Sequence, residues 1–216
     1  MKIVRSKRKT IALVIESDGS LTVRAPLRFS RKKIEQLLVE KTDWILERQD
    51  WIRQHATAVH HFEAGEQFYY LGKTYPLVYV DHQVQPLILS ESFLLKRNLN
   101  IRAKEIFIAW YRDQARHLIC ERASKLANQY KLTCKDIHIT GARTRWGSCS
   151  IRGTLNFSWR LVMAPIEVID YVIIHELAHL KIHNHSTEYW DYVERLSPNY
   201  RTLRKWLKEN GGRFSF

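Results

Sequence analysis

The ten residues YVIIHELAHL, at positions 171–180, decide the fold of the C-terminal half of the chain. They lie within a longer apolar run, Val168–Leu180, that is compatible with a buried helix. Pro165 suits the first turn of this helix, and Glu167 is well placed against its N-terminal dipole. The pattern therefore predicts a buried helix that starts near Pro165 and runs on through Ile182.

His175 and His179 are four positions apart in this stretch, in an H-E-x-x-H pattern with Glu176. Four residues turn an α-helix by about 400°, so both imidazoles project from one face, one turn apart. Two imidazoles there can reach one ion at ~2.0–2.1 Å, and Glu176 can deprotonate a water molecule beside it. The alternative is a pair of core histidines satisfied by hydrogen bonds, but burying these three groups without a partner is costly.

A catalytic zinc ion needs a third protein ligand and one open position. On an unbroken helix His183 would lie about 12 Å along the axis from His175, too far to share the ion. His185 becomes available if the chain turns at Asn184, since asparagine tolerates the left-handed conformation that ends helices. We predict His185 as the third ligand. The other candidates are His183, Glu188 and Glu194.

A loop at Arg143–Ser150 precedes the motif. Its arginines Arg143 and Arg145, with the indole of Trp146, can clamp an anionic or carbonyl group, so we predict that these three residues bind substrate. The alternative is a turn whose tryptophan fills the core. The loop lacks the spacing of a phosphate-binding loop.

Strand and helix patterns surround this loop. Asp136–Thr140 and Leu155–Trp159 alternate as strands, and a long amphipathic helix is expected from about Ala103 to Lys131. We expect Leu155–Ser158 to offer a sheet edge to which an extended peptide adds as a strand.

The N-terminal part has β character. Lys9–Glu16 and Leu21–Ala25 flank a turn and predict a hairpin, and a helix is expected after Ser30. Short β-rich runs follow at Gln67–Leu71, Lys73–Val80 and Gln85–Leu89. We therefore predict an α+β protein, with a β-rich module over residues 1–102 and a compact metal-binding domain over residues 103–216.

The composition of the 216 residues, 45% hydrophobic and 26% charged, excludes a disordered chain, collagen and a coiled-coil rod. No apolar run approaches the ~20 residues that cross a bilayer, and no signal peptide is evident, so no membrane association is expected. Cys120, Cys134 and Cys149 lack C-x-x-C spacing, which argues against a disulfide framework or cysteine zinc site. We expect a cytoplasmic protein.

The formal net charge is +13, from 35 basic and 22 acidic residues. Residues 1–60 carry 13 basic and 7 acidic side chains, and residues 106–165 carry 10 and 3. A field of this size attracts anions, nucleic acid included. The alternative is a solvated basic surface, and charge alone does not separate the two.

Several motifs together resemble one known family, the YgjP-like metal-dependent hydrolases. They are Arg145–Cys149, Trp159–Leu161, Ala164–Pro165, Asp170–Val172, His175–Leu180, Asn184–Ser186, Trp190, Arg5–Thr10, Tyr70–Lys73 and Tyr75. The resemblance covers nearly the whole chain. It implies zinc held by His175, His179 and His185, with Glu176 as general base. The family is grouped with zinc metallopeptidases and is similar to SprT-like and Wss-type proteases, some of which act on protein bound or crosslinked to DNA.

The histidine spacing also fits the metzincin ligand pattern, but Ile182 replaces its glycine. The methionines, Met1 and Met163, both precede the motif, so no Met-turn follows it. This indicates a zincin-like domain with three histidine ligands outside the metzincins.

These observations predict a hydrolase that uses one zinc ion, or another divalent metal, and most favour a metallopeptidase with a polypeptide substrate. The first alternative is a metal-dependent nucleoside triphosphate pyrophosphatase, since Arg143, Arg145 and the basic surface suit a nucleotide substrate. The second is a nucleic-acid-binding module with a structural metal.

Overall fold

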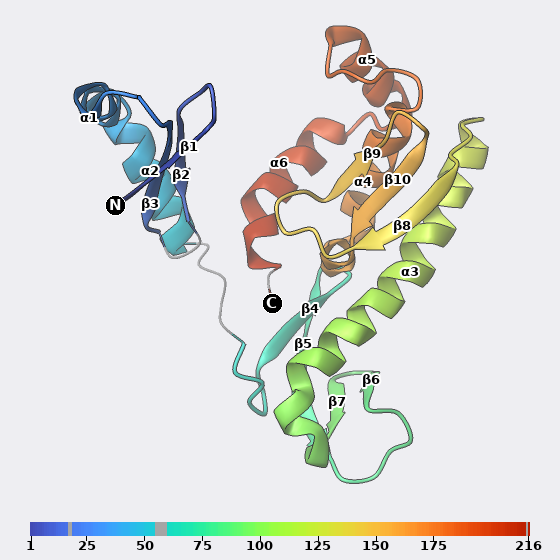
Figure 1. Ribbon diagram of the computed structural model, residues 1–216. Coiled ribbons are helices and arrows are strands. Elements are labelled where there is room, and N and C mark those ends of the chain that lie inside the picture. The colour runs from blue at the N-terminus through green and yellow to red at the C-terminus, as the bar shows by residue number, and fades with distance from the viewer. Residues whose placement is uncertain (17–18, 55–59, 215) are drawn as a thin grey trace. The chain divides into compact units, whose positions relative to one another are not determined.

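The computed structural model describes residues 1–16, 19–54, 60–214 and 216 (Figure 1). The chain divides into two compact units, Met1–Ala58 and Val59–Phe216. None of the helices in these described ranges is long and apolar enough to cross a bilayer.

The first unit contains a three-stranded sheet in the order β1-β3-β2, made of β1 (Lys2–Ser6), β3 (Leu21–Pro26) and β2 (Ala12–Ile15). Strand β3 pairs antiparallel with β2, which confirms the predicted hairpin, and parallel with β1, which the sequence analysis did not anticipate. Helices α1 (Arg31–Glu40) and α2 (Thr42–Gln54) follow. Val23, Ala25 and Ile34 form its small core.

The second unit begins with a four-stranded sheet in the order β4-β5-β7-β6. Its strands are β4 (Gln67–Tyr70), β5 (Lys73–Val80), β6 (Leu87–Leu89) and β7 (Phe93–Lys96). The 3₁₀ helix η1 (Arg97–Arg102) leads from β7 into the long helix α3 (Ala103–Gln129), which matches the predicted long helix.

These strands share one hydrophobic core with the C-terminal elements. Phe68, Leu77 and Phe93 are fully buried in the same cluster as Phe107 and Tyr111 of α3. The compact units therefore divide between residues 58 and 59, whereas the sequence analysis placed a boundary after residue 102. Packing of β4–β7 onto α3 accounts for the difference.

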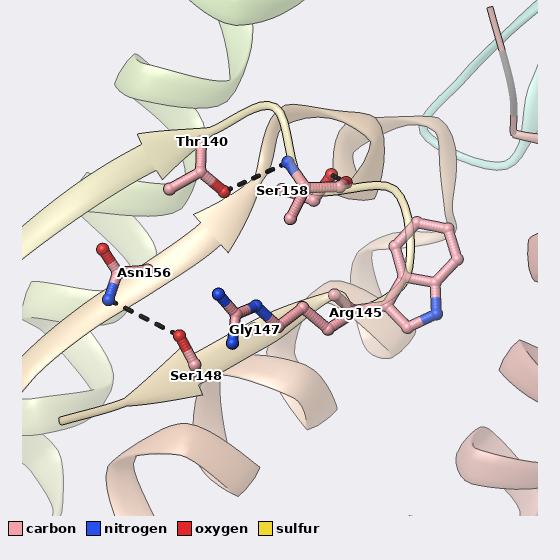
Figure 2. A pocket seen from close by; sticks show the side chains of 8 residues that line it. Thr140, Arg145, Gly147, Ser148, Asn156 and Ser158 are labelled. Atoms are coloured by element: carbon pink, nitrogen blue, oxygen red, sulfur yellow. Dashed lines mark hydrogen bonds between the residues drawn. The ribbon is translucent and has the colours of Figure 1, made fainter. Parts of the chain in front are cut away.

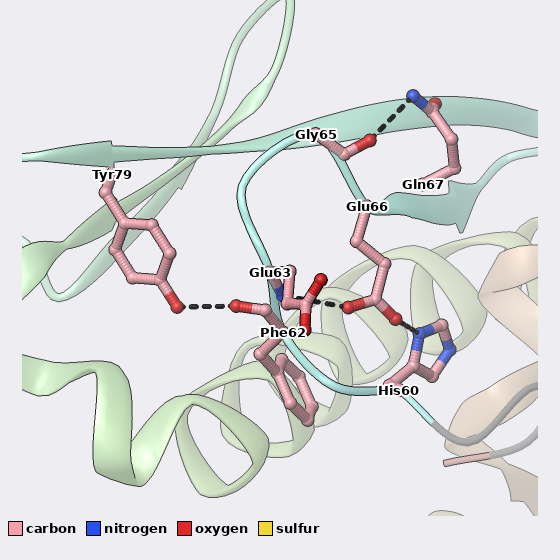
Figure 3. A network of polar contacts seen from close by, with 7 residues as sticks. All are labelled: His60, Phe62, Glu63, Gly65, Glu66, Gln67 and Tyr79. Carbon is pink, nitrogen blue, oxygen red and sulfur yellow. Dashed lines mark hydrogen bonds and ion pairs between the residues drawn. The ribbon is translucent and has the colours of Figure 1, made fainter.

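The start of the second unit is anchored by polar and ring contacts (Figure 3). His60 Nδ1 lies 2.7 Å from Glu66 Oε1, and the His60 ring stacks on Phe68 with centroids 4.5 Å apart. The Tyr79 hydroxyl donates a hydrogen bond of 2.6 Å to the carbonyl oxygen of Phe62. The His60 side chain is only 14% exposed, so it packs with this unit.

A second sheet stands next to the predicted motif, in the order β8-β10-β9. Strand β10 (Thr154–Ser158) is parallel to β8 (Asp136–Thr140) and antiparallel to β9 (Gly147–Cys149). The expectation that Leu155–Ser158 forms a sheet edge is therefore wrong, because these residues lie in the central strand. The edge belongs to β9, whose short run of small and polar residues carries no strand pattern.

The remaining elements are helical. The 3₁₀ helix η2 (Trp159–Met163) precedes α4 (Ile166–Ala178), and α5 (Thr187–Leu196), α6 (Tyr200–Asn210) and the 3₁₀ helix η3 (Gly211–Arg213) follow. Most of α4 is buried in the main core, as its apolar sequence predicts.

Helix α4 ends at Ala178 and does not continue through Ile182 as predicted. The Leu180 amide donates to the carbonyl oxygen of Leu177, three residues before it, which tightens the last turn. Ser186 caps α5, since its hydroxyl accepts a hydrogen bond from the Tyr189 amide.

Candidate metal centre

The structure brings the three predicted histidine ligands together. His185 Nε2 lies 3.1 Å from His179 Nε2 and 3.3 Å from His175 Nε2. Within the described residues, these imidazoles form a group whose ligand atoms all lie within 4.8 Å of one another. The other candidates for third ligand are outside this group: His183 and Glu188 are exposed, and Glu194 pairs with Arg201.

The spacing of these nitrogen atoms fits one tetrahedral ion. Ligand nitrogens at ~2.0–2.1 Å from such an ion lie ~3.3–3.4 Å from one another, close to the two distances found. His179 Nδ1 lies 3.0 Å from the carbonyl oxygen of Ile182. A proton on Nδ1 donates to that carbonyl and leaves the Nε2 lone pair facing the other histidines. The donor set therefore suits a divalent metal of the zinc type.

Burial keeps two of these histidines neutral. It lowers the pKa of His175 to about 3, with further contributions from His179, His185 and Arg204. Burial also lowers the pKa of His179. Because a metal ligand must be deprotonated, both imidazoles are ready to bind a cation at neutral pH.

Two aromatic residues of α5 support the histidines. Tyr189 is fully buried, its hydroxyl donates a 2.9 Å hydrogen bond to the carbonyl oxygen of His175, and its ring stacks on His179. The Trp190 ring stacks on His185 with centroids 5.6 Å apart. These contacts pack both aromatic rings against the three histidines.

Glu176 is buried beside the histidines, with 5% of its surface exposed. Burial raises the pKa of its carboxyl to about 8, and the charge of Arg145 opposes this shift. A Cβ atom at Gly147 would lie 2.5 Å from Glu176 Oε1. Only glycine lets β9 approach the carboxylate so closely.

We expect Gly147→Ala to lower the free energy of unfolding by about 1–3 kcal/mol, because the new methyl group overpacks against Glu176. Urea unfolding measures the change. Ser148→Ala is the matched control, since Ser148 lies on the same strand and faces the other side of the sheet. Equal stability of wild type and Gly147→Ala would contradict the tight contact.

A cavity of about 230 Å³ opens next to these groups. It is lined by Arg145, Trp146, Gly147, Tyr171, Val172, His175, Glu176 and Leu207. A second cavity, of about 340 Å³, lies on the β8-β10-β9 sheet (Figure 2). Of the three predicted substrate-binding residues, Arg145 and Trp146 line both cavities and Arg143 lines neither. The Trp146 ring also packs edge-on against Phe214, so it serves the core as well.

The family model for the YgjP-like metallopeptidase domain matches residues 9–210. The chain belongs to the YgjP-like family. The chain is also similar to a solved structure, the metallopeptidase zymogen abylysin of Pyrococcus abyssi, with 21% sequence identity and a TM-score of 0.41. That match covers 44% of this chain and 96% of abylysin. Comparison with curated proteins gives no match.

Sequence reasoning missed two residues of this YgjP-like site, Gly147 and Tyr171. Tyr171 lies one helical turn before His175 on α4 and lines the same cavity. Its spacing of four residues from His175 was a usable signal, because it places both side chains on one helix face. Gly147 gave no such signal, since its contact with Glu176 joins distant parts of the chain.

We expect His185→Ala to weaken metal binding far more than His183→Ala does. In the YgjP-like chain only His185 brings its Nε2 atom to the other two histidines, and His183 is an exposed residue of the same loop. Competition with a zinc chelator measures both affinities. The reverse ranking would remove His185 from the ligand set.

Proposed function

We propose that this chain is a zinc-dependent metallopeptidase with His175, His179 and His185 as metal ligands and Glu176 as general base. The observation that carries the proposal is the convergence of three imidazole nitrogens beside a buried carboxylate. A zinc ion held there would supply Lewis-acid chemistry, polarising a scissile carbonyl and lowering the pKa of water at the site.

Glu176 moves the proton in this scheme. Its carboxylate takes a proton from the attacking water and passes it to the leaving amine as the peptide bond breaks. Burial raises the pKa of this carboxyl to about 8, close to neutral pH, so both its charged and its protonated form are accessible, and the charge of Arg145 favours the charged form. The close contact with Gly147 fixes the carboxylate in one position.

Tyr171 supplies a hydrogen-bond donor to the same cavity. Burial raises the pKa of its hydroxyl to about 12, so the proton stays on the oxygen at neutral pH. In the scheme this hydroxyl donates to the substrate carbonyl oxygen, which gains negative charge during attack.

The substrate chain lies along β9. This strand pairs with β10 on one side and, among the strands described, with none on the other. Its residue Gly147 touches Glu176, so a peptide that adds to this edge passes the general base. Arg145 and Trp146, which precede β9, line the cavity that receives it.

A nucleoside triphosphate pyrophosphatase is the second candidate, favoured by the guanidinium of Arg145, which lines the cavity of the metal centre. The test is turnover by zinc-loaded wild type and by Glu176→Gln, with an unfolded protein and a panel of nucleoside triphosphates. Glu176-dependent cleavage of the polypeptide supports the metallopeptidase. Glu176-dependent release of pyrophosphate from a nucleotide, with no peptide cleavage, replaces it with the second candidate.

A structural metal in a nucleic-acid-binding module fits the site less well than a catalytic metal does. Structural zinc sites are usually closed by four protein ligands, whereas the group found in the described residues has three.

The three cysteines are free, as a reducing cytoplasm requires, and we retain the cytoplasm as the proposed location.

A further inference from the structure

Three arginines gather around the turn Gly141–Ala142, which follows β8. Arg160 donates from Nη1 to the carbonyl oxygens of Gly141 at 3.2 Å and Ala142 at 3.5 Å. Arg112 of α3 reaches the same turn, since its Nη2 would lie 3.3 Å from a Cβ atom at Gly141. Arg143 is the next residue in the chain, and its charge acts on Arg160. The guanidinium groups of Arg112 and Arg160 therefore reach one turn, and Arg143 follows that turn directly in the chain.

We define the arginine cluster as Arg112, Arg143 and Arg160. In the described part of the chain, none of its members forms an ion pair. Arg160 is only 7% exposed, and burial lowers its pKa together with the charges of Arg143 and Arg112. Like charges held together in a partly buried place destabilise one another, and an anion would relieve that repulsion.

The second cavity adjoins the cluster through Ala142, which forms part of its wall. Its floor is the polar face of the sheet, with Asn156 and Ser158 opposite the buried side chains of Leu155 and Phe157. Arg145 forms another wall, and in Figure 2 its side chain projects over the strands. The cavity thus offers the Asn156 amide and the Arg145 guanidinium as donors, since the Thr140 and Ser158 hydroxyls donate to backbone carbonyl oxygens.

We propose that this cavity and the arginine cluster bind the carboxylate of an acidic residue in the polypeptide substrate. The inference rests on the proposed function, because the two cavities share Arg145, Trp146 and Gly147. A peptide along β9 runs past Gly147 toward this end of the sheet, where β8 and β10 also end. Guanidinium groups bind carboxylates through paired, charge-assisted hydrogen bonds.

A polypeptide fits this place better than a nucleic acid. Single-stranded nucleic acids are held by aromatic side chains that stack on the bases, along an extended basic groove. The one aromatic residue among the described residues that line this cavity is Trp146, whose ring packs against Phe214. The cluster is also compact, surrounding a single turn.

The test measures binding to the full-length Glu176→Gln protein, which does not consume the probe. Fluorescence anisotropy compares a labelled peptide rich in glutamate with the same peptide carrying glutamine. We expect the acidic peptide to bind about tenfold more tightly, and the preference to shrink with added salt. The double variant Arg112→Gln, Arg143→Gln should lose this preference. Both arginines are exposed, so the core is untouched.

Arg152→Gln is the matched control, since it removes the same charge from the turn at the opposite end of β10. It should keep the preference for the acidic peptide. Arg143→Glu provides a second measurement, because reversing the charge should lower affinity for the acidic peptide more than Arg143→Gln does.

Equal binding of both peptides, or equal loss in Arg152→Gln, would overturn the proposal. So would a single-stranded oligonucleotide that displaces the acidic peptide and depends on the same arginines. The assay involves no turnover, so a failed preference leaves the metallopeptidase proposal intact. Conversely, if the wild type cleaves no polypeptide, the measured preference for the acidic peptide still stands.

Discussion

Turnover of an unfolded polypeptide should fall at least ~100-fold in Glu176→Gln, the low end for loss of a general base. Glutamine keeps the size and most of the hydrogen bonding of glutamate but does not accept the proton from water. It is about as good a helix former, so α4 should remain intact. Steady-state kinetics on zinc-loaded protein measures the loss of turnover. Zinc content measured in parallel shows whether the site on α4 remains intact.

Glu167→Gln is the matched control, because it makes the same chemical change at an exposed position in the first turn of α4. Its turnover should match that of wild type. Near-normal turnover in Glu176→Gln with a full complement of zinc would remove Glu176 from its proposed role. A loss of zinc together with activity would show instead that Glu176 helps to hold the ion.

Tight zinc binding should be lost in His175→Ala and in His179→Ala. Each change removes one of three converging nitrogens, so affinity should fall by more than the ~10–100-fold that loss of an outer partner costs. Elemental analysis after dialysis against a chelator measures occupancy. We expect about one zinc per chain in wild type, as one three-histidine centre implies.

His117→Ala serves as control, because His117 is an exposed histidine of α3 outside the group of three. It should retain the wild-type zinc content. Full occupancy in either His175→Ala or His179→Ala would place the metal elsewhere and would undermine the proposed centre as a whole.

The elements that could be predicted are those with strong periodicity. Helix α3 and the buried helix α4 have long apolar patterns, and the β2-β3 hairpin flanks a turn rich in Asp, Gly and Ser. The β9 strand was missed because Gly147–Cys149 contains no bulky or branched residue. Its strand character comes from pairing with β10, which is a tertiary effect.

The end of α4 and the domain division could not be predicted for related reasons. The apolar sequence continues past Ala178, but the chain turns so that His179 Nδ1 meets the carbonyl oxygen of Ile182. Strands β4–β7 read as an independent module because their pattern gives no sign of the core that they share with α3. At the end of α4 a hydrogen bond between neighbouring residues overrides the apolar pattern, and for β4–β7 packing against a distant segment does so.

The group of three histidines and the contact between Gly147 and Glu176 differ in the sequence separation of their residues. The outermost histidines are ten positions apart, so closing their ring costs little chain entropy. Gly147 meets Glu176 only after β9 has joined β10. The three histidines are therefore encoded locally in the sequence, whereas the contact of Gly147 with Glu176 depends on the tertiary structure.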